Sequence, residues 1–125
     1  MVFDSDVLIW FLRGNSNAQK MVLKEAPFKI SAVTYMEIVQ GMRNKKELSI
    51  FKKLIKILDI DILQIDTDIS KMAISLVEQF YLSDSMQMAD ALIASVCLKY
   101  NETLCTGNEK HFKPIKALSL EIFRP

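Results

Sequence analysis

The 125-residue chain contains only three glycines, three prolines, two cysteines and one histidine. So few turn-forming residues disfavour an all-β sandwich or barrel, which needs many tight turns. Cys97 and Cys105 stand among apolar residues without the spacing of metal ligands, and with a single histidine they argue against a zinc site. We expect both cysteines to be reduced core thiols of a cytoplasmic protein.

An excess of charge of one sign is also missing, because 16 Lys and Arg balance 15 Asp and Glu to give a net charge of +1. This balance excludes a general nucleic-acid coat but not a local basic patch. The longest nearly uncharged stretch, residues 85–98, is too short for a membrane span of roughly 20 residues. Asp4 interrupts the apolar start of the chain, so we expect neither a signal peptide nor a membrane segment.

The residues that are present suit one globular domain over residues 1–125, since 50% of them are hydrophobic and 25% are charged. Apolar runs predict strands near residues 2–3, 28–31, 62–65, 103–106 and 118–123. Helical patterns are predicted near residues 7–14, 18–25, 34–41, 45–58, 67–80 and 86–100, with Thr67 as a cap. Strands that alternate with helices imply βαβ crossovers, and therefore an α/β fold with a mostly parallel sheet.

Three polar residues follow the predicted strands. Asp4 comes directly after the first strand, Glu37 lies about one turn into the helix after the second, and Asn108 follows the fourth. Ligands of parallel sheets bind beyond the carboxyl ends of the strands, so we expect these side chains to share one edge.

Asp90 is the only charged residue within residues 85–98. We expect its helix to be central and buried, where an unpaired carboxylate is costly. A basic or hydroxyl partner would be enough for Asp90 alone. Convergence of Asp90 with Asp4 and Glu37 would instead require protons or a divalent cation. Oxygen-only ligands favour a hard ion such as Mg²⁺ or Mn²⁺.

Each carboxylate site also has a structural interpretation. Glu37 follows Thr34 by three residues, as in a capping box. Asp6 suits a charge in the first turn of a helix, stabilised by the helix dipole, better than direct metal ligation. Asn108 is equally suited to cap a short helix over residues 109–112.

Four segments together resemble the motifs of PIN-domain nucleases. They are residues 2–9 (VFDSDVLI), 31–37 (SAVTYME), 89–94 (ADALIA) and 106–112 (TGNEKHF). The length and simplicity of the chain resemble VapC-type toxins of bacterial toxin–antitoxin pairs. The resemblance covers almost the whole chain, in order.

The resemblance implies a three-layer α/β/α sandwich, Mg²⁺- or Mn²⁺-dependent endoribonuclease activity, homodimerisation and inhibition by a cognate antitoxin. It implies that Asp4 and Asp90 hold the metal, that Glu37 completes the acidic cluster, and that the Thr106 hydroxyl supports it. The family usually has Asp at the fourth catalytic position, where this chain has Asn108. The missing charge weakens the case for a second metal ion.

Basic residues near these motifs are candidates for contacts with RNA phosphates. We expect them at Arg13, Lys110 and Lys113, whereas the lysines of residues 45–56 are as well explained as a solvated helix face. For His111 we expect packing or an RNA contact rather than acid–base catalysis.

Two other functions fit part of the pattern. Asp4 and Asp6 after a strand resemble the start of haloacid-dehalogenase-type phosphatases, but no paired Asp follows downstream. A PIN-like domain that binds RNA or a partner without cutting is the second alternative, and Asn108 is its only support.

Overall fold

The computed structural model describes all 125 residues and contains one five-stranded parallel sheet. Its strands are β1 (Val2–Phe3), β2 (Lys29–Ser31), β3 (Asp61–Leu63), β4 (Leu104–Thr106) and β5 (Leu120–Ile122). They lie in the order β3-β2-β1-β4-β5, and every neighbouring pair is parallel. The predicted α/β fold with a parallel sheet is therefore confirmed.

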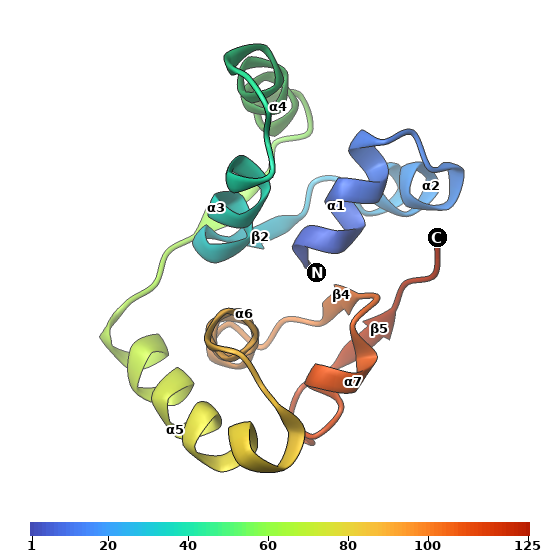
Figure 1. The fold of residues 1–125 in the computed structure, drawn as a ribbon. Helices are drawn as coiled ribbons and strands as arrows, with labels where there is room; N and C mark the ends of the chain where they lie inside the picture. Colours follow the sequence, from blue (N-terminus) through green and yellow to red (C-terminus); the bar gives the residue numbers. More distant parts are fainter.

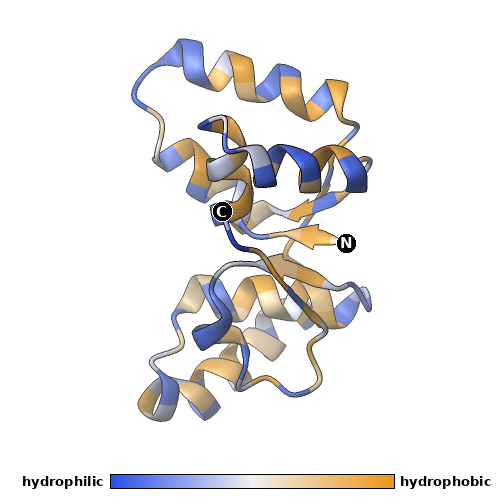
Figure 2. Cartoon of the chain, turned by 90° about the vertical axis from the view of Figure 1, so that its right-hand side faces the viewer, coloured by the Kyte–Doolittle hydropathy of each residue, from blue (hydrophilic) through white to orange (hydrophobic).

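Helices cover both faces of the sheet (Figures 1 and 2). They are α1 (Ser5–Leu12), α2 (Ser16–Glu25), α3 (Ala32–Gln40), α4 (Lys45–Ile57), α5 (Thr67–Asp84), α6 (Met88–Lys99) and α7 (Glu109–Phe112). Figure 1 shows α1 to α4 on one side of the sheet and α5 to α7 on the other. None of the helices is both long and apolar enough to span a membrane.

The strands separate two hydrophobic cores because successive side chains of a strand point to opposite faces. On β1, Val2 belongs to the core formed with α5 and α6, and Phe3 belongs to the core formed with α1 and α2. On β4, Leu104 and Cys105 divide in the same way. This alternation produces the three-layer α/β/α sandwich.

Two predicted N-cap residues are wrong. Ser31, not Thr34, caps α3, since its hydroxyl oxygen accepts a hydrogen bond from the Thr34 amide at 3.0 Å. Thr34 is therefore inside the helix, and the capping box proposed for Thr34 and Glu37 does not form. In α5 the cap is Asp66 rather than Thr67, because the Asp66 carboxylate accepts from the amide of Ile69 at 2.9 Å.

The strand order determines where a site can form. The chain runs from the central β1 outward through β2 and β3, and then returns to place β4 on the other side of β1. The loops that leave β1 and β4 diverge at this point, which opens a crevice at the carboxyl edge of the sheet. Asp4 follows β1, and Gly107 and Asn108 follow β4 at the same edge.

Candidate active site at the carboxyl edge of the sheet

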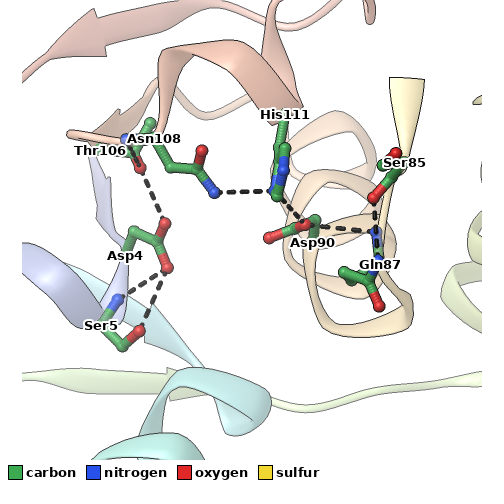
Figure 3. Close-up of polar contacts among 8 residues, drawn as sticks. All are labelled: Asp4, Ser5, Ser85, Gln87, Asp90, Thr106, Asn108 and His111. Carbon is green, nitrogen blue, oxygen red and sulfur yellow. Dashed lines mark hydrogen bonds and ion pairs between the residues drawn. The ribbon is translucent and has the colours of Figure 1, made fainter.

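Asp4 is the most buried carboxylate of this edge, with 6% of its surface exposed. It caps α1, and its Oδ1 accepts a hydrogen bond from the Ser5 amide at 2.7 Å. Its Oδ2 accepts from the Thr106 hydroxyl at 2.8 Å (Figure 3). Because the Thr106 oxygen itself accepts from the Asn108 amide at 3.0 Å, the ends of β1 and β4 are joined through one buried hydroxyl.

Burial has a large effect on the charge of Asp4. Burial, the largest cause, and the nearby Asp6 and Glu37 carboxylates together raise the pKa of this carboxyl from 3.8 to about 7, against the hydrogen bonds from Thr106 and Ser5, which lower it. An acid with a pKa near neutrality, crowded by other acids, is typical of a functional site.

Glu37 on α3 carries an oxygen that no protein group satisfies. Its Oε1 is buried and has no hydrogen-bond partner. Burial raises the pKa of Glu37, the Ser5 side chain lowers it, and the charges of Asp90 and Asp6 raise it. Glu37 is therefore close enough to Asp6 on α1 and to Asp90 on α6 to be repelled by both, although the three come from distant parts of the chain.

Asp90 lies at the start of α6 rather than in its middle, since the helix begins at Met88. The Gln87 amide donates to Asp90 Oδ2 at 3.3 Å, which closes part of the first turn. The predicted start of this helix at residue 86 is therefore two residues too early, whereas its expected burial is confirmed, because residues 91 and 93–97 are buried. Met86 belongs to the loop before the helix, where it is fully buried, so its apolar character did not indicate a helix.

Asn108 and His111 complete the cluster on the side of α7. The His111 Nδ1 atom lies 3.0 Å from Asp90 Oδ2 and 3.1 Å from Asn108 Nδ2 (Figure 3). Asn108 occupies the cap position of α7, but its side chain makes no capping hydrogen bond. His111 was not predicted to join the acidic cluster; its spacing of three residues from Asn108 on a predicted helix was the only signal.

Asp6 joins α1 to the turn after β4. Its Oδ1 accepts from the amide of Val7 at 2.8 Å, and its Oδ2 accepts from the amide of Gly107 at 2.8 Å. Burial raises the pKa of Asp6, and these backbone hydrogen bonds lower it. The expected place in the first turn of a helix is confirmed, and the hydrogen bond to Gly107 gives Asp6 a second structural role.

The fit of this cluster to a metal ion depends on its oxygen atoms. No group of three or more His, Cys, Asp or Glu side chains is arranged so that it could hold a metal ion by itself. Mg²⁺ nevertheless keeps several waters and needs only one or two carboxylates from the protein. The unpartnered Glu37 oxygen and the protonation-prone Asp4 are groups that a hard cation would stabilise, so the residues fit such an ion.

Comparison with known proteins identifies the family, because the model of the PIN domain matches residues 1–117. The chain belongs to the PIN-domain family. Ribonuclease VapC1 of Methanocaldococcus jannaschii is 35% identical to this PIN domain over 97 residues, which are 75% of this chain and 68% of that protein. The match argues against the phosphatase alternative.

Solved structures share the fold of this PIN domain. A toxin–antitoxin complex from Klebsiella pneumoniae matches with a TM-score of 0.75 at 24% identity, covering 94% of this chain and 93% of that chain. VapBC from Salmonella typhimurium, solved bound to DNA, matches with a TM-score of 0.83 at 16% identity, covering 97% of this chain and 96% of that chain. VapBC-1 from nontypeable Haemophilus influenzae gives 0.79 at 18% identity, covering 98% of each.

The basic residues of this PIN domain lie at different distances from the acidic cluster. Lys110 and Lys113 are exposed on and directly after α7, and they border a shallow surface hollow together with Glu109. Arg13 caps the end of α1, whereas Asp4 caps its start, so the two are about 13–14 Å apart along the helix axis. The Arg13 guanidinium lies over the Trp10 ring, 5.8 Å from its centre.

Proposed function

We propose that this PIN domain is the endoribonuclease toxin of a VapC-type toxin–antitoxin pair and hydrolyses RNA phosphodiester bonds with Mg²⁺ or Mn²⁺. Family membership and the name of the M. jannaschii relative support the ribonuclease activity. The observation that carries the metal dependence is the buried, unpartnered Glu37 oxygen beside an Asp4 whose pKa is about 7.

The energetics of the cluster favour a cation. Leaving a buried polar atom without a hydrogen bond costs about 1–3 kcal/mol, and more for a charged group. Two carboxylates about 4 Å apart repel by about 4 kcal/mol at an effective dielectric constant near 20. A divalent cation would offset both the cost of the unpaired oxygen and the repulsion between the carboxylates. Asp4 and Asp90 would hold it, and Glu37 would complete the pocket.

The residues of the chain have separate roles in this scheme. When bound, the ion polarises the phosphoryl oxygen and lowers the pKa of a water molecule. Glu37, whose pKa burial raises, would serve as the group that orients a water molecule and accepts its proton. Thr106 holds the Asp4 carboxylate in place through its hydroxyl. Asn108, anchored to the same hydroxyl by its backbone, positions a further oxygen or amide group at the edge of the pocket.

RNA must approach an acidic pocket, so a positive rim is required. Lys110 and Lys113 provide it on and beside α7, close to Asn108. Arg13, at the far end of α1, would contact phosphates further along the strand. These contacts supply affinity without sequence preference.

A cognate antitoxin and a second copy of the chain are the proposed protein partners. The solved relatives described as toxin–antitoxin and VapBC complexes support the antitoxin. Exposed apolar side chains on α5 and α6, among them Ile74, Leu82 and Met88, support a homodimer interface. Both cysteines are buried and free, which suits the proposed cytoplasmic location.

The function is tested by incubating purified protein with RNA in Mg²⁺, in Mn²⁺ and in EDTA. We expect cleavage in either metal and none in EDTA. The Asp90→Asn variant keeps the shape of the side chain but loses its charge, and should lower the rate at least about 100-fold. Retention of RNA by the wild-type protein without cleavage in either metal would favour the non-catalytic PIN-like alternative.

A further inference from the structure

His111 is the residue of the site that the proposed mechanism does not use. It lies on α7, and its ring reaches Asp90 on α6, which is 21 residues earlier in the chain. The same Nδ1 atom also contacts the Asn108 side chain. The side chain is 28% exposed and Asp90 is 14% exposed, so the contact is at the rim of the pocket rather than in the core.

The chemistry of the contact defines which atom carries the hydrogen. An ionised carboxylate only accepts hydrogen bonds, so the 3.0 Å contact requires His111 Nδ1 to donate to Asp90 Oδ2. Asp90 Oδ2 also accepts from the Gln87 amide. Both donors therefore hold the same oxygen of Asp90, and its other oxygen turns toward the side of the pocket where Asp4 lies (Figure 3).

The Asn108 side chain lies beside the same ring, but its Nδ2 only donates and forms no hydrogen bond with an Nδ1 that donates to Asp90. Its side chain is not used to cap α7 and instead lies 3.1 Å from His111 Nδ1, while its backbone amide donates to Thr106. A series of close contacts thus runs from Asp4 through Thr106, Asn108 and His111 to Asp90 (Figure 3). It connects the carboxylate after β1 to the carboxylate at the start of α6.

We propose that His111 is a positioning residue of the metal pocket and that it acts through Nδ1 on Asp90. This inference rests on the proposed function. Groups that orient metal ligands typically change metal affinity about 10–100-fold when they are removed. A histidine that only filled space would be replaceable by any side chain of similar size.

Two amide variants distinguish these roles. Asn places a nitrogen or oxygen where His has Nδ1, whereas Gln places one near Nε2. The affinity of each metal-free protein for Mn²⁺ can be measured without RNA cleavage. The electron paramagnetic resonance signal of free Mn²⁺ decreases as the ion binds. We expect His111→Ala and His111→Gln to weaken Mn²⁺ binding about 10–100-fold, and His111→Asn to remain close to wild type.

The opposite pattern would overturn the inference. Equal Mn²⁺ affinity in all variants, or rescue by Gln but not by Asn, would exclude positioning through Nδ1. Circular-dichroism melting of each variant identifies loss of fold; if His111→Ala unfolds, the comparison of Asn with Gln remains.

Histidine-dependent Mn²⁺ binding by a protein that cuts no RNA would refute the proposed function alone. Cleavage and binding that are unaffected at position 111 would refute the positioning role alone, and no Mn²⁺ binding by the wild type would contradict both.

Discussion

At the residue scale, Asp4 couples the stability of the protein to pH. Its pKa is raised from 3.8 to about 7, so between these values the folded protein keeps a proton that the unfolded chain releases. The stabilising contribution is complete below pH 4 and is lost as the pH rises through 7. The difference in pKa corresponds to about 4 kcal/mol.

The Asp4→Asn variant isolates this contribution. Asn stays neutral, so its free energy of unfolding relative to the wild type should increase by a few kcal/mol between pH 4 and pH 8 in the absence of metal. Urea unfolding at several pH values measures this. The same variant should lose nearly all RNA cleavage. A constant difference across the pH range would show that Asp4 has an ordinary pKa.

Thr106 provides a second test at this scale. Thr106→Val keeps the shape of this fully buried side chain but removes the donor to Asp4 and the acceptor for the Asn108 amide. We expect it to destabilise the protein by about 1–3 kcal/mol and to raise the pKa of Asp4 further. Thr106→Ser retains the hydroxyl and serves as the control. A larger loss in Thr106→Ser than in Thr106→Val would indicate that the methyl group, not the hydroxyl, matters.

The site residues that follow strand ends could be predicted from the sequence. One site residue, whose position depends on the packing of two helices, was missed. Asp4, Glu37 and Asn108 were predictable because each follows a predicted strand of a parallel sheet. His111 was not assigned to the cluster, because its contact with Asp90 depends on the packing of α7 beside α6. The metal roles of these residues stay predictions.

At the element scale, the turn between β4 and α7 controls the geometry of the site. A Cβ atom on Gly107 would lie 2.7 Å from Asp6 Oδ2, the oxygen that accepts the Gly107 amide, and 3.3 Å from the Phe123 carbonyl oxygen. Gly107→Ala should therefore displace Asp6 and destabilise the protein by about 1–3 kcal/mol. Thermal and urea unfolding measure the change.

Gly41 is a matched control for this substitution. It ends α3 in a right-handed conformation, and a Cβ there would approach no atom closer than 3.5 Å. Gly41→Ala should be neutral or stabilise the protein by up to about 1 kcal/mol, since Ala restricts the unfolded chain. A similar loss in both variants would mean that the close approach at Gly107 is not the cause.

The helices and strands were largely predictable, because short apolar runs and amphipathic patterns alternate clearly along the chain. The errors lie at their ends. The α5 helix continues to Asp84 rather than residue 80, and it ends where Ser85 adopts a left-handed conformation with φ of 58°. Ser85 is neither Gly nor Asn, the residues that usually mark such an end, so the composition gave no stop signal.

At the scale of the whole molecule, metal binding should stabilise the fold. Folding brings the carboxylates close together, so a cation should bind the folded protein and not the unfolded chain. Such a cation raises the free energy of unfolding by about 2.7 kcal/mol when its concentration is 100 times its dissociation constant. We expect the melting temperature to rise with millimolar Mg²⁺ or Mn²⁺. The melting temperature of the Asp90→Asn variant should rise much less. An equal rise in both proteins would place the bound metal elsewhere.

We infer that Asp4 after β1, Glu37 on α3 and Asp90 on α6 form one cation pocket. An NMR pH titration of the side-chain carboxyl carbon of Asp4, with and without Mg²⁺, tests this pocket. We expect a midpoint near pH 7 without metal and a much lower midpoint with Mg²⁺, because a bound cation favours the ionised acid. A midpoint that Mg²⁺ leaves unchanged would contradict this inference.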